Sequence, residues 1–143
     1  MEASIILDCS NYSESITDIL KIFQRIGWNT RNSQGEVTYL PIGDSDMYNW
    51  VKQKISEEEL YTIISNKIIT GEQIGIDLFY NTSSEGLSLL AYNTSQIILS
   101  LSINRKLIDT RHTDMAWYWE NIIHKFINEG VELLSYNIKE YDD

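Results

Sequence analysis

The side chains best suited to catalysis or metal binding in this sequence are His112, His124 and Cys9. A histidine can serve as a base or a ligand, and a cysteine thiolate as a nucleophile or a ligand. A tetrahedral metal site needs four ligands of matched type, and neither histidine lies in an HExxH or CxxC context. We therefore predict that the protein has no metal site and that Cys9 is a buried structural thiol.

Pairs of carboxylates are the second kind of group that could do acid–base chemistry. Asp44 with Asp46, and the run of Glu57, Glu58 and Glu59, are the candidates. Both groups lie just before expected helices, where they are typical of N-terminal caps and of acids that complement the helix dipole. The sequence also has no GxGxxG, GxxxxGK[ST] or GxSxG motif. We therefore predict that the protein is not an enzyme and uses no cofactor.

The elements that must position any site are organised around residues 74–108. Three segments there alternate apolar residues with polar or mixed ones, which is the period of strands with one apolar face. The loops between them are short and rich in Asn, Ser and Thr, so the segments are expected to pair as an antiparallel meander. Their apolar faces are expected to contain Ile74, Ile76, Leu78, Tyr80, Leu87, Leu89, Ala91, Ile97, Leu99, Leu101 and Ile103.

Capping residues and helical periodicity predict three main helices, at 15–27, 56–71 and 113–130, and a short helical segment at 47–51. Glycine is expected to end each of the three main helices. The helix at 56–71 is expected to bury Leu60, Ile63, Ile64 and Ile68. At 100° per residue, the helix at 113–130 places Met115, Trp119, Ile122, Ile123 and Phe126 on one face, and Trp117 and Glu120 on the other.

These elements together predict a single α+β domain that spans residues 1–143. Strands are also expected at 36–42 and 134–138, and residues 3–9 form either a strand or the lead-in to the first helix. The antiparallel sheet is expected to have about four to six strands, with the meander at its centre. About three to four helices are expected to pack mainly on one face.

Charge is the strongest signal in the composition. The chain has 11 Lys and Arg against 21 Asp and Glu, which leaves a formal net charge of −10 at pH 7. Such a field repels phosphates, so we expect no direct binding to nucleic acid or to an anionic membrane surface. It favours a basic protein partner, although the same charge would also serve solubility alone.

Further features of the sequence bear on the compartment. There is one cysteine, no apolar run long enough to cross a bilayer, and no basic region before a hydrophobic one at the N-terminus. A lone cysteine cannot form an internal disulfide and fits a reducing compartment. We therefore expect a cytoplasmic protein without a membrane segment.

The layout of a small, acidic α+β chain without a catalytic motif resembles the immunity proteins of bacterial polymorphic-toxin and contact-dependent growth inhibition systems. The segments that carry the resemblance are Ser-Glu-Glu-Glu-Leu at 56–60, Gly-Glu-Gln-Ile-Gly at 71–75 and Thr-Asp-Met-Ala-Trp-Tyr-Trp at 113–119. The resemblance implies that the protein binds one cognate toxin domain, which in these systems is often a basic nuclease, and blocks its active site or its substrate groove.

Placement in the sequence suggests which residues would make such an interface. An aromatic side chain on the polar face of a helix is a natural anchor, and acids at helix starts would mimic the phosphates that a nuclease grips. The expected partner-binding residues are Asp44, Asp46, Glu57, Glu58, Trp117 and Glu120.

Two alternatives remain open from the sequence. The polar face of the sheet could bind a small molecule or a peptide, or support a minor enzyme activity, with the ligand against Asp77, Tyr80 and Tyr92. A concave pocket with a perturbed carboxylate would favour this alternative. The second alternative is a structural subunit whose exposed apolar residues form a homodimer.

Overall fold

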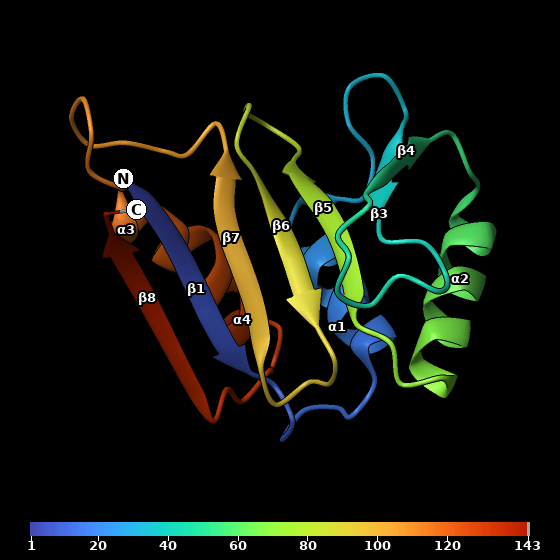
Figure 1. Cartoon of the computed structure of the whole chain (residues 1–143). Coiled ribbons are helices and arrows are strands. Elements are labelled where there is room, and N and C mark those ends of the chain that lie inside the picture. The colour runs from blue at the N-terminus through green and yellow to red at the C-terminus, as the bar shows by residue number, and fades with distance from the viewer. Residues whose placement is uncertain (143) are drawn as a thin grey trace.

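An antiparallel sheet with helices behind it forms the framework of the computed structural model, which describes residues 1–142 (Figure 1). The described residues contain the strands β1 (Glu2–Asp8), β2 (Trp28–Asn29), β3 (Val37–Tyr39), β4 (Val51–Gln53), β5 (Ile74–Tyr80), β6 (Gly86–Ala91), β7 (Ile97–Ile103) and β8 (Ser135–Tyr141).

The strand order β4-β3-β5-β6-β7-β1-β8, with β2 also paired to β5, puts the predicted meander at the centre of the sheet. The α+β fold is therefore confirmed. The sheet has eight strands within residues 1–142, more than predicted. The extra ones, β2 and β4, have two and three residues, which is too short for an alternating pattern to show in the sequence.

Register in the meander follows the predicted alternation except at the end of β7. Ser88 lies opposite Ser100, but Gly86 lies opposite Ile103, so a β-bulge adds one residue to β7. A bulge shifts the following side chain to the other face of the sheet. Ile103 therefore leaves the face of Leu101, which the sequence predicted it would share, and lies beside Asp77 and Ser88.

The core lies between the sheet and the helices α1 (Ile16–Arg25), α3 (Met115–Tyr118), η1 (Trp119–His124) and α4 (Lys125–Asn128). Figure 1 shows α1 and α4 behind the sheet. The rings of Phe23 and Phe126 meet edge to face, with centroids 4.9 Å apart, and join α1 to α4. Burial of such side chains contributes about 1.5–3 kcal/mol each.

The helix α2 (Glu57–Ile69) begins as predicted, since the hydroxyl of Ser56 accepts a hydrogen bond from the Glu59 amide at 3.0 Å. Its buried face differs from the predicted one at a single turn. Ile68 is exposed, whereas Lys67 is buried. A polar side chain was not expected there, because an apolar pattern alone cannot reveal hydrogen-bond partners supplied by another segment.

No helix within residues 1–142 combines the length and the apolar character needed to span a bilayer.

The helical segment from Met115 to Asn128 contains the π-helical stretch η1, which the sequence did not predict. A π turn spaces its hydrogen bonds at i to i+5, so residues before it are rotated relative to a regular α-helix. Met115 is exposed, contrary to the prediction, and Tyr118, for which the sequence made no prediction, is fully buried. The expected short helix at 47–51 is also absent, since residues 51–53 form the edge strand β4.

Cys9 lies at the end of β1 with no measurable exposure, so its prediction as a buried thiol is confirmed. Burial, with a smaller contribution from the Asp8 charge, raises the pKa of the Cys9 thiol to about 12. The reactive thiolate is therefore scarce at neutral pH.

We predict that Cys9 reacts with Ellman's reagent at pH 8 at least 100-fold more slowly in the native protein than in 6 M guanidinium chloride. The absorbance of the released thionitrobenzoate measures both rates. Fast labelling of the native protein would show that β1 opens readily, in conflict with its pairing to both β7 and β8.

Candidate functional site

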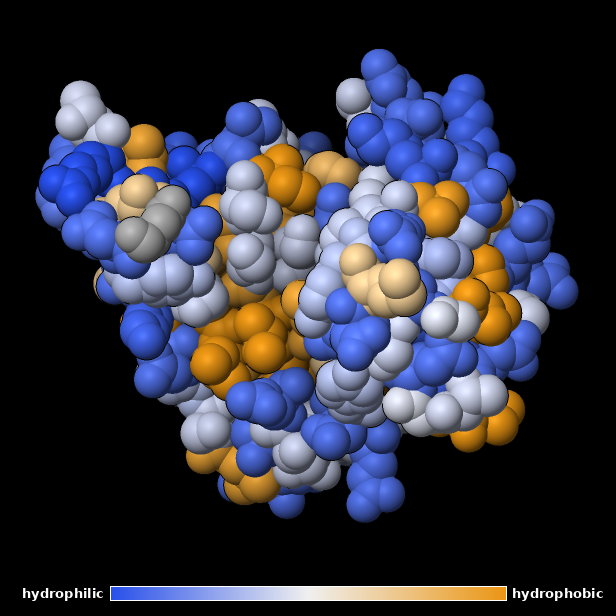
Figure 2. Space-filling model, in the orientation of Figure 1, coloured by the Kyte–Doolittle hydropathy of each residue, from blue (hydrophilic) through white to orange (hydrophobic). Residues whose placement is uncertain are grey.

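The sheet face opposite α1 and α4 is open over β1, β7 and β6, and we call it the front face. Figure 2 shows apolar atoms gathered there. Ile6 lies opposite Ile98, and Ile98 lies opposite Leu90, so three strands contribute to one cross-strand apolar row. Ile6 is 36% exposed, and the other two are half-buried. Uncovered apolar rows of this kind are typical of binding surfaces.

A polar row runs beside the apolar one. Ser4 lies opposite Ser100, Ser100 opposite Ser88, and Ser88 opposite Asp77, so hydroxyl groups from β1, β7 and β6 lead to a carboxylate on β5. The Ser88 hydroxyl donates a hydrogen bond of 2.6 Å to Asp77 Oδ1. Lys139 of β8 lies opposite Ser4 at the other end of the row.

Asp77 lies in a groove of about 460 Å³, which we call the Asp77 groove. Burial raises the pKa of Asp77 above its usual value, against the lowering effects of the Ser88 hydrogen bond and of the Lys52 charge. A perturbed carboxylate in a concave site is a recognised sign of a binding function, and it is the feature named above as favouring a ligand on the polar face of the sheet. The groove is lined by Asn32, Thr38, Trp50, Lys52, Asp77, Phe79, Ser88 and Ile103.

Residues 40–50, which we call the Asp44 loop, cross the front of the sheet near β5 (Figure 1). Gly75 of β5 allows this approach, because a Cβ there would lie 2.6 Å from Leu40 Cδ1 and 3.0 Å from Trp50 Cη2. Gly75 also lies opposite Leu90. The Asp44 loop therefore forms a wall where the apolar row reaches β5.

The Asp44 loop is held by two buried charged groups. Lys67 of α2 donates hydrogen bonds to the backbone carbonyls of Leu40, Pro41 and Asp44, at 3.1, 2.9 and 2.7 Å. Desolvation lowers the pKa of Lys67, and the charges of Glu72 and Asp44 oppose that shift. The ammonium group thus replaces its lost water with carbonyl oxygens.

The Asp44 carboxylate organises the other half of the loop. It accepts hydrogen bonds from the amides of Met47, Tyr48 and Asn49, at 3.0, 3.1 and 2.7 Å. Burial alone would raise the pKa of Asp44, but these hydrogen bonds and the Lys67 charge together lower it. The turn is consequently fixed from inside by an ionised carboxylate.

The tip of the Asp44 loop exposes large apolar and aromatic side chains, of kinds that are usually buried in folded proteins. Met47 is 72% exposed, Ile42 is 54% exposed, and Tyr48 is 48% exposed with a backbone φ of 57°. A positive φ is unfavourable for a bulky residue and persists only where surrounding contacts fix it. The loop therefore presents an apolar, rigid tip, with the exposed acid Asp46 beside it.

Three of the expected partner-binding residues, Asp46, Glu58 and Glu120, are exposed. Asp44 is buried and accepts hydrogen bonds from amides of its own loop. The sequence shows two nearby acids there, but it does not show which of them is buried. Glu57 is half-buried and accepts a hydrogen bond from Gln24 at 2.6 Å. These residues do not form one patch, since Figure 1 places α2 and α3 at opposite ends of the molecule.

Trp117 lies on the helix side of the protein. Its ring packs against those of Trp28, Tyr80 and Tyr118, with centroids 6.1, 5.3 and 4.9 Å away. It is half-buried within this aromatic cluster. The region around Trp28 covers part of the Trp117 ring. Trp117 therefore packs against the core, and part of its side chain is exposed.

The three residues suggested for a small ligand, Asp77, Tyr80 and Tyr92, do not converge. The Tyr80 hydroxyl contacts Asn121 and Lys125 of the helix layer, at 2.7 and 2.6 Å. Tyr92 contacts the Ser45 hydroxyl at 3.1 Å. Asp77 lines the Asp77 groove, Tyr80 lines the neighbouring hollow described next, and Tyr92 lines neither.

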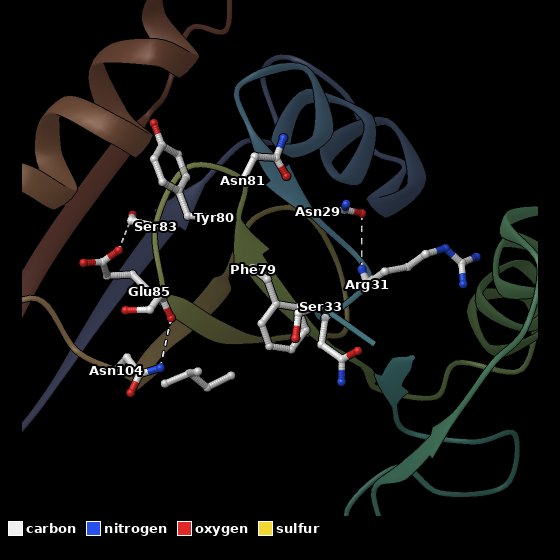
Figure 3. A pocket seen from close by; sticks show the side chains of 12 residues that line it. Asn29, Arg31, Ser33, Phe79, Tyr80, Asn81, Ser83, Glu85 and Asn104 are labelled. Carbon is white, nitrogen blue, oxygen red and sulfur yellow. Dashed lines mark hydrogen bonds between the residues drawn. The ribbon is translucent and has the colours of Figure 1, made fainter. Parts of the chain in front are cut away.

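A second hollow of about 510 Å³ lies at the end of the β5–β6 hairpin (Figure 3). It shares Asn32, Phe79 and Ile103 with the Asp77 groove, so the two hollows adjoin each other. Its Glu85 carboxylate is buried and accepts a hydrogen bond from Ser83. The hollow thus lies next to the groove, on the side of the hairpin.

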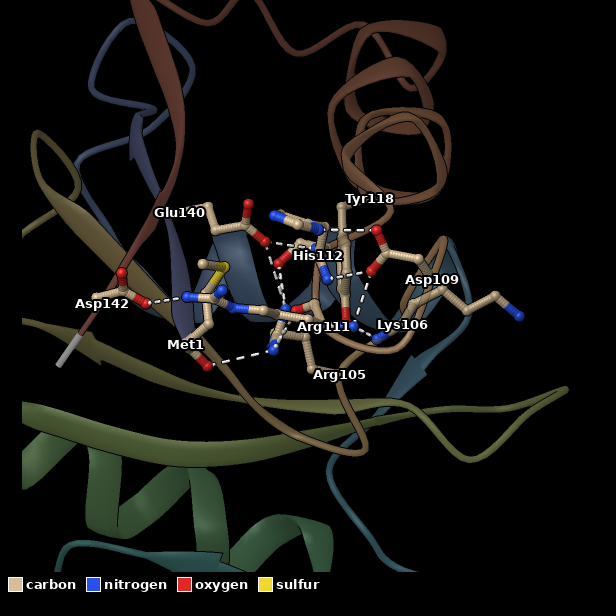
Figure 4. Close-up of polar contacts among 10 residues, drawn as sticks. Met1, Arg105, Lys106, Asp109, Arg111, His112, Tyr118, Glu140 and Asp142 are labelled. Carbon is tan, nitrogen blue, oxygen red and sulfur yellow. Dashed lines mark hydrogen bonds and ion pairs between the residues drawn. The ribbon is translucent and has the colours of Figure 1, made fainter.

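His112 lies in a polar cluster that joins the chain ends to the loop after β7 (Figure 4). Arg105 donates to Thr113 Oγ1 and to the Met1 carbonyl, at 2.6 and 3.2 Å. Hydrogen bonds from the His112 and Arg111 amides lower the pKa of Asp109 to about 2. These contacts explain the cluster structurally. Among residues 1–142, no group of three or more His, Cys, Asp and Glu side chains is arranged to hold a metal.

Local sequence patterns did not predict which residues of distant segments meet on the front face. The alternating serines in β6 and β7 indicated the polar face, but they did not indicate that these serines align with Asp77.

Comparison with protein-family models, with curated proteins and with solved structures finds no match to this chain.

We predict that Lys67→Met lowers the free energy of unfolding by about 2–4 kcal/mol, because it removes charge-assisted hydrogen bonds and leaves buried carbonyls unpaired. Urea denaturation followed by tryptophan fluorescence measures this. Lys54→Met is the matched control and changes stability by less than about 0.5 kcal/mol, since Lys54 is exposed. Equal stability of the two variants would contradict the structural role of Lys67.

Proposed function

We propose that this protein binds and neutralises a basic toxin domain, as the immunity proteins it resembles do, and that it uses the front face and the tip of the Asp44 loop. The observation that carries the proposal is the open apolar row of Ile6, Ile98 and Leu90 together with the exposed Met47 and Tyr48. Apolar and aromatic side chains on a rigid support are the usual anchors of protein interfaces.

Charge supports a basic partner. Several of the positive side chains are already paired within the chain: Arg25 with Glu129, Arg31 with Glu57, Arg105 with Glu140, Lys106 with Glu85 and Arg111 with Asp142. Lys67 is buried. A partner therefore meets mainly the remaining acids, and complementary fields raise association rates toward about 10⁸–10⁹ M⁻¹s⁻¹ at low salt.

The properties of an inhibitor of a basic protein are long-range attraction by charge and short-range contact through apolar and polar groups, and this protein offers both. The net charge of −10 acts at long range, whereas the front face offers apolar and hydroxyl groups at short range. Nucleic acid would be repelled by the same field. A basic nuclease that is itself built to attract phosphates would be drawn in.

The functional test begins with the neighbouring genes: where one of them encodes a large secreted protein, its C-terminal domain is co-expressed with this chain. We predict that the wild-type chain rescues cell growth and co-purifies with that domain, whereas Met47→Glu with Ile6→Glu abolishes both, because charges are then buried in the interface. Failure of the wild-type chain to rescue cells from such a domain would contradict the proposal.

A charge-matched pair of variants locates the surface. We predict that Asp46→Lys slows association with the toxin domain at least fivefold at low salt, and that Glu120→Lys, on the helix side, changes the rate less than twofold. Surface plasmon resonance at two salt concentrations measures the rates. The reverse result would move the interface to the helix that carries Trp117 and Glu120.

A further inference from the structure

The Asp77 groove contains the elements that recognise a planar cation. Asp77 Oδ1 accepts one hydrogen bond, from Ser88, and an ionised carboxylate has about four acceptor sites. Guanidinium groups bind carboxylates through two parallel hydrogen bonds. Asp77 therefore retains the capacity to receive an arginine.

Aromatic side chains stand beside the carboxylate. Phe79 follows Asp77 by two residues on β5, so both side chains lie on the front face, and Trp50 lines the same groove from the Asp44 loop. Flat guanidinium groups stack on such rings and are weakly hydrated, which lowers the cost of bringing them into a half-buried site. An ammonium group would use these rings less well.

Space beyond the groove can accommodate the chain that carries the cation. The hollow of about 510 Å³ beside the β5–β6 hairpin adjoins the groove and shares three lining residues with it. Polar side chains such as Asn29, Asn81 and Asn104 line that hollow and can meet a peptide backbone. Its lining also contains two charged residues, Arg31, which pairs with Glu57, and the buried Glu85. A side chain that points toward Asp77 thus has room for its own main chain outside the sheet.

We propose that the Asp77 groove receives the guanidinium group of one arginine side chain from the basic partner, with Asp77 as its counter-ion and Trp50 and Phe79 as its stacking surfaces. The source of the arginine rests on the proposed function. The chemistry of the groove rests on the geometry of Asp77, Ser88, Trp50 and Phe79 alone.

Lys52 and pH should both modulate this site. Lys52 of β4 is the charged residue besides Asp77 in the groove lining, and the others, from β3, β5, β6, β7 and the loops, are neutral. Its positive charge opposes an incoming cation. Because burial raises the pKa of Asp77, binding should weaken as the pH falls through that raised value and the carboxylate is protonated.

The direct test titrates the protein with ethylguanidinium chloride and follows the Trp50 indole N–H by NMR. A saturable shift in the millimolar range is expected at pH 7, with binding at least tenfold weaker in Asp77→Asn and at least twofold tighter in Lys52→Gln. Glu14→Gln, which removes an exposed carboxylate that is not in the groove lining, is the matched control and leaves binding unchanged. Neutral ethylurea, of the same shape, is expected not to saturate.

The outcomes separate this inference from the proposed function. Absence of a saturable ethylguanidinium shift at Trp50 overturns the inference, whether or not the toxin domain is bound. Full neutralisation of the toxin domain by Asp77→Asn also overturns it and leaves the proposed function standing. If Asp77→Asn does not fold, the wild-type titration decides: binding that persists unchanged from pH 7 to pH 3 overturns the inference.

Discussion

The buried ammonium group of Lys67 determines how the front of this molecule is built. Removing such a charge from water costs several kcal/mol unless hydrogen bonds replace the lost hydration. The carbonyls of Leu40, Pro41 and Asp44 provide those bonds. Because they belong to the loop after β3 and Lys67 belongs to α2, one charge fixes two segments against each other.

The unusual features of the front face follow from that anchor. Asp44 is held next to the ammonium group, and its carboxylate in turn orders the amides of Met47, Tyr48 and Asn49. A tyrosine with a positive φ can persist at the tip because the loop is fixed on both sides of it. The wall beside the Asp77 groove, including Trp50, therefore depends on α2, although α2 contributes no residue to the groove lining.

Local patterns predicted the parts of the fold that local physics decides. Alternation predicted β5, β6 and β7, and the cap at Ser56 predicted the start of α2, because each depends on neighbouring residues only. The bulge that moves Ile103, the π turn of η1 and the burial of Lys67 depend on contacts with distant segments. For the same reason the sequence indicated a polar sheet face but not the groove, whose lining comes from five strands and two loops.

The position of Asp77 connects the overall charge to the local chemistry. A strongly acidic surface attracts any basic partner, so it raises encounter rates without selecting among such partners. The front face is mainly apolar and hydroxyl-lined, and there a misplaced cation would lose hydration without gaining a counter-ion. Asp77, at the end of the polar row, is the residue on this face that can act as the counter-ion of a cation. Selectivity would then come from matching one arginine to one carboxylate, while the remaining acids supply attraction.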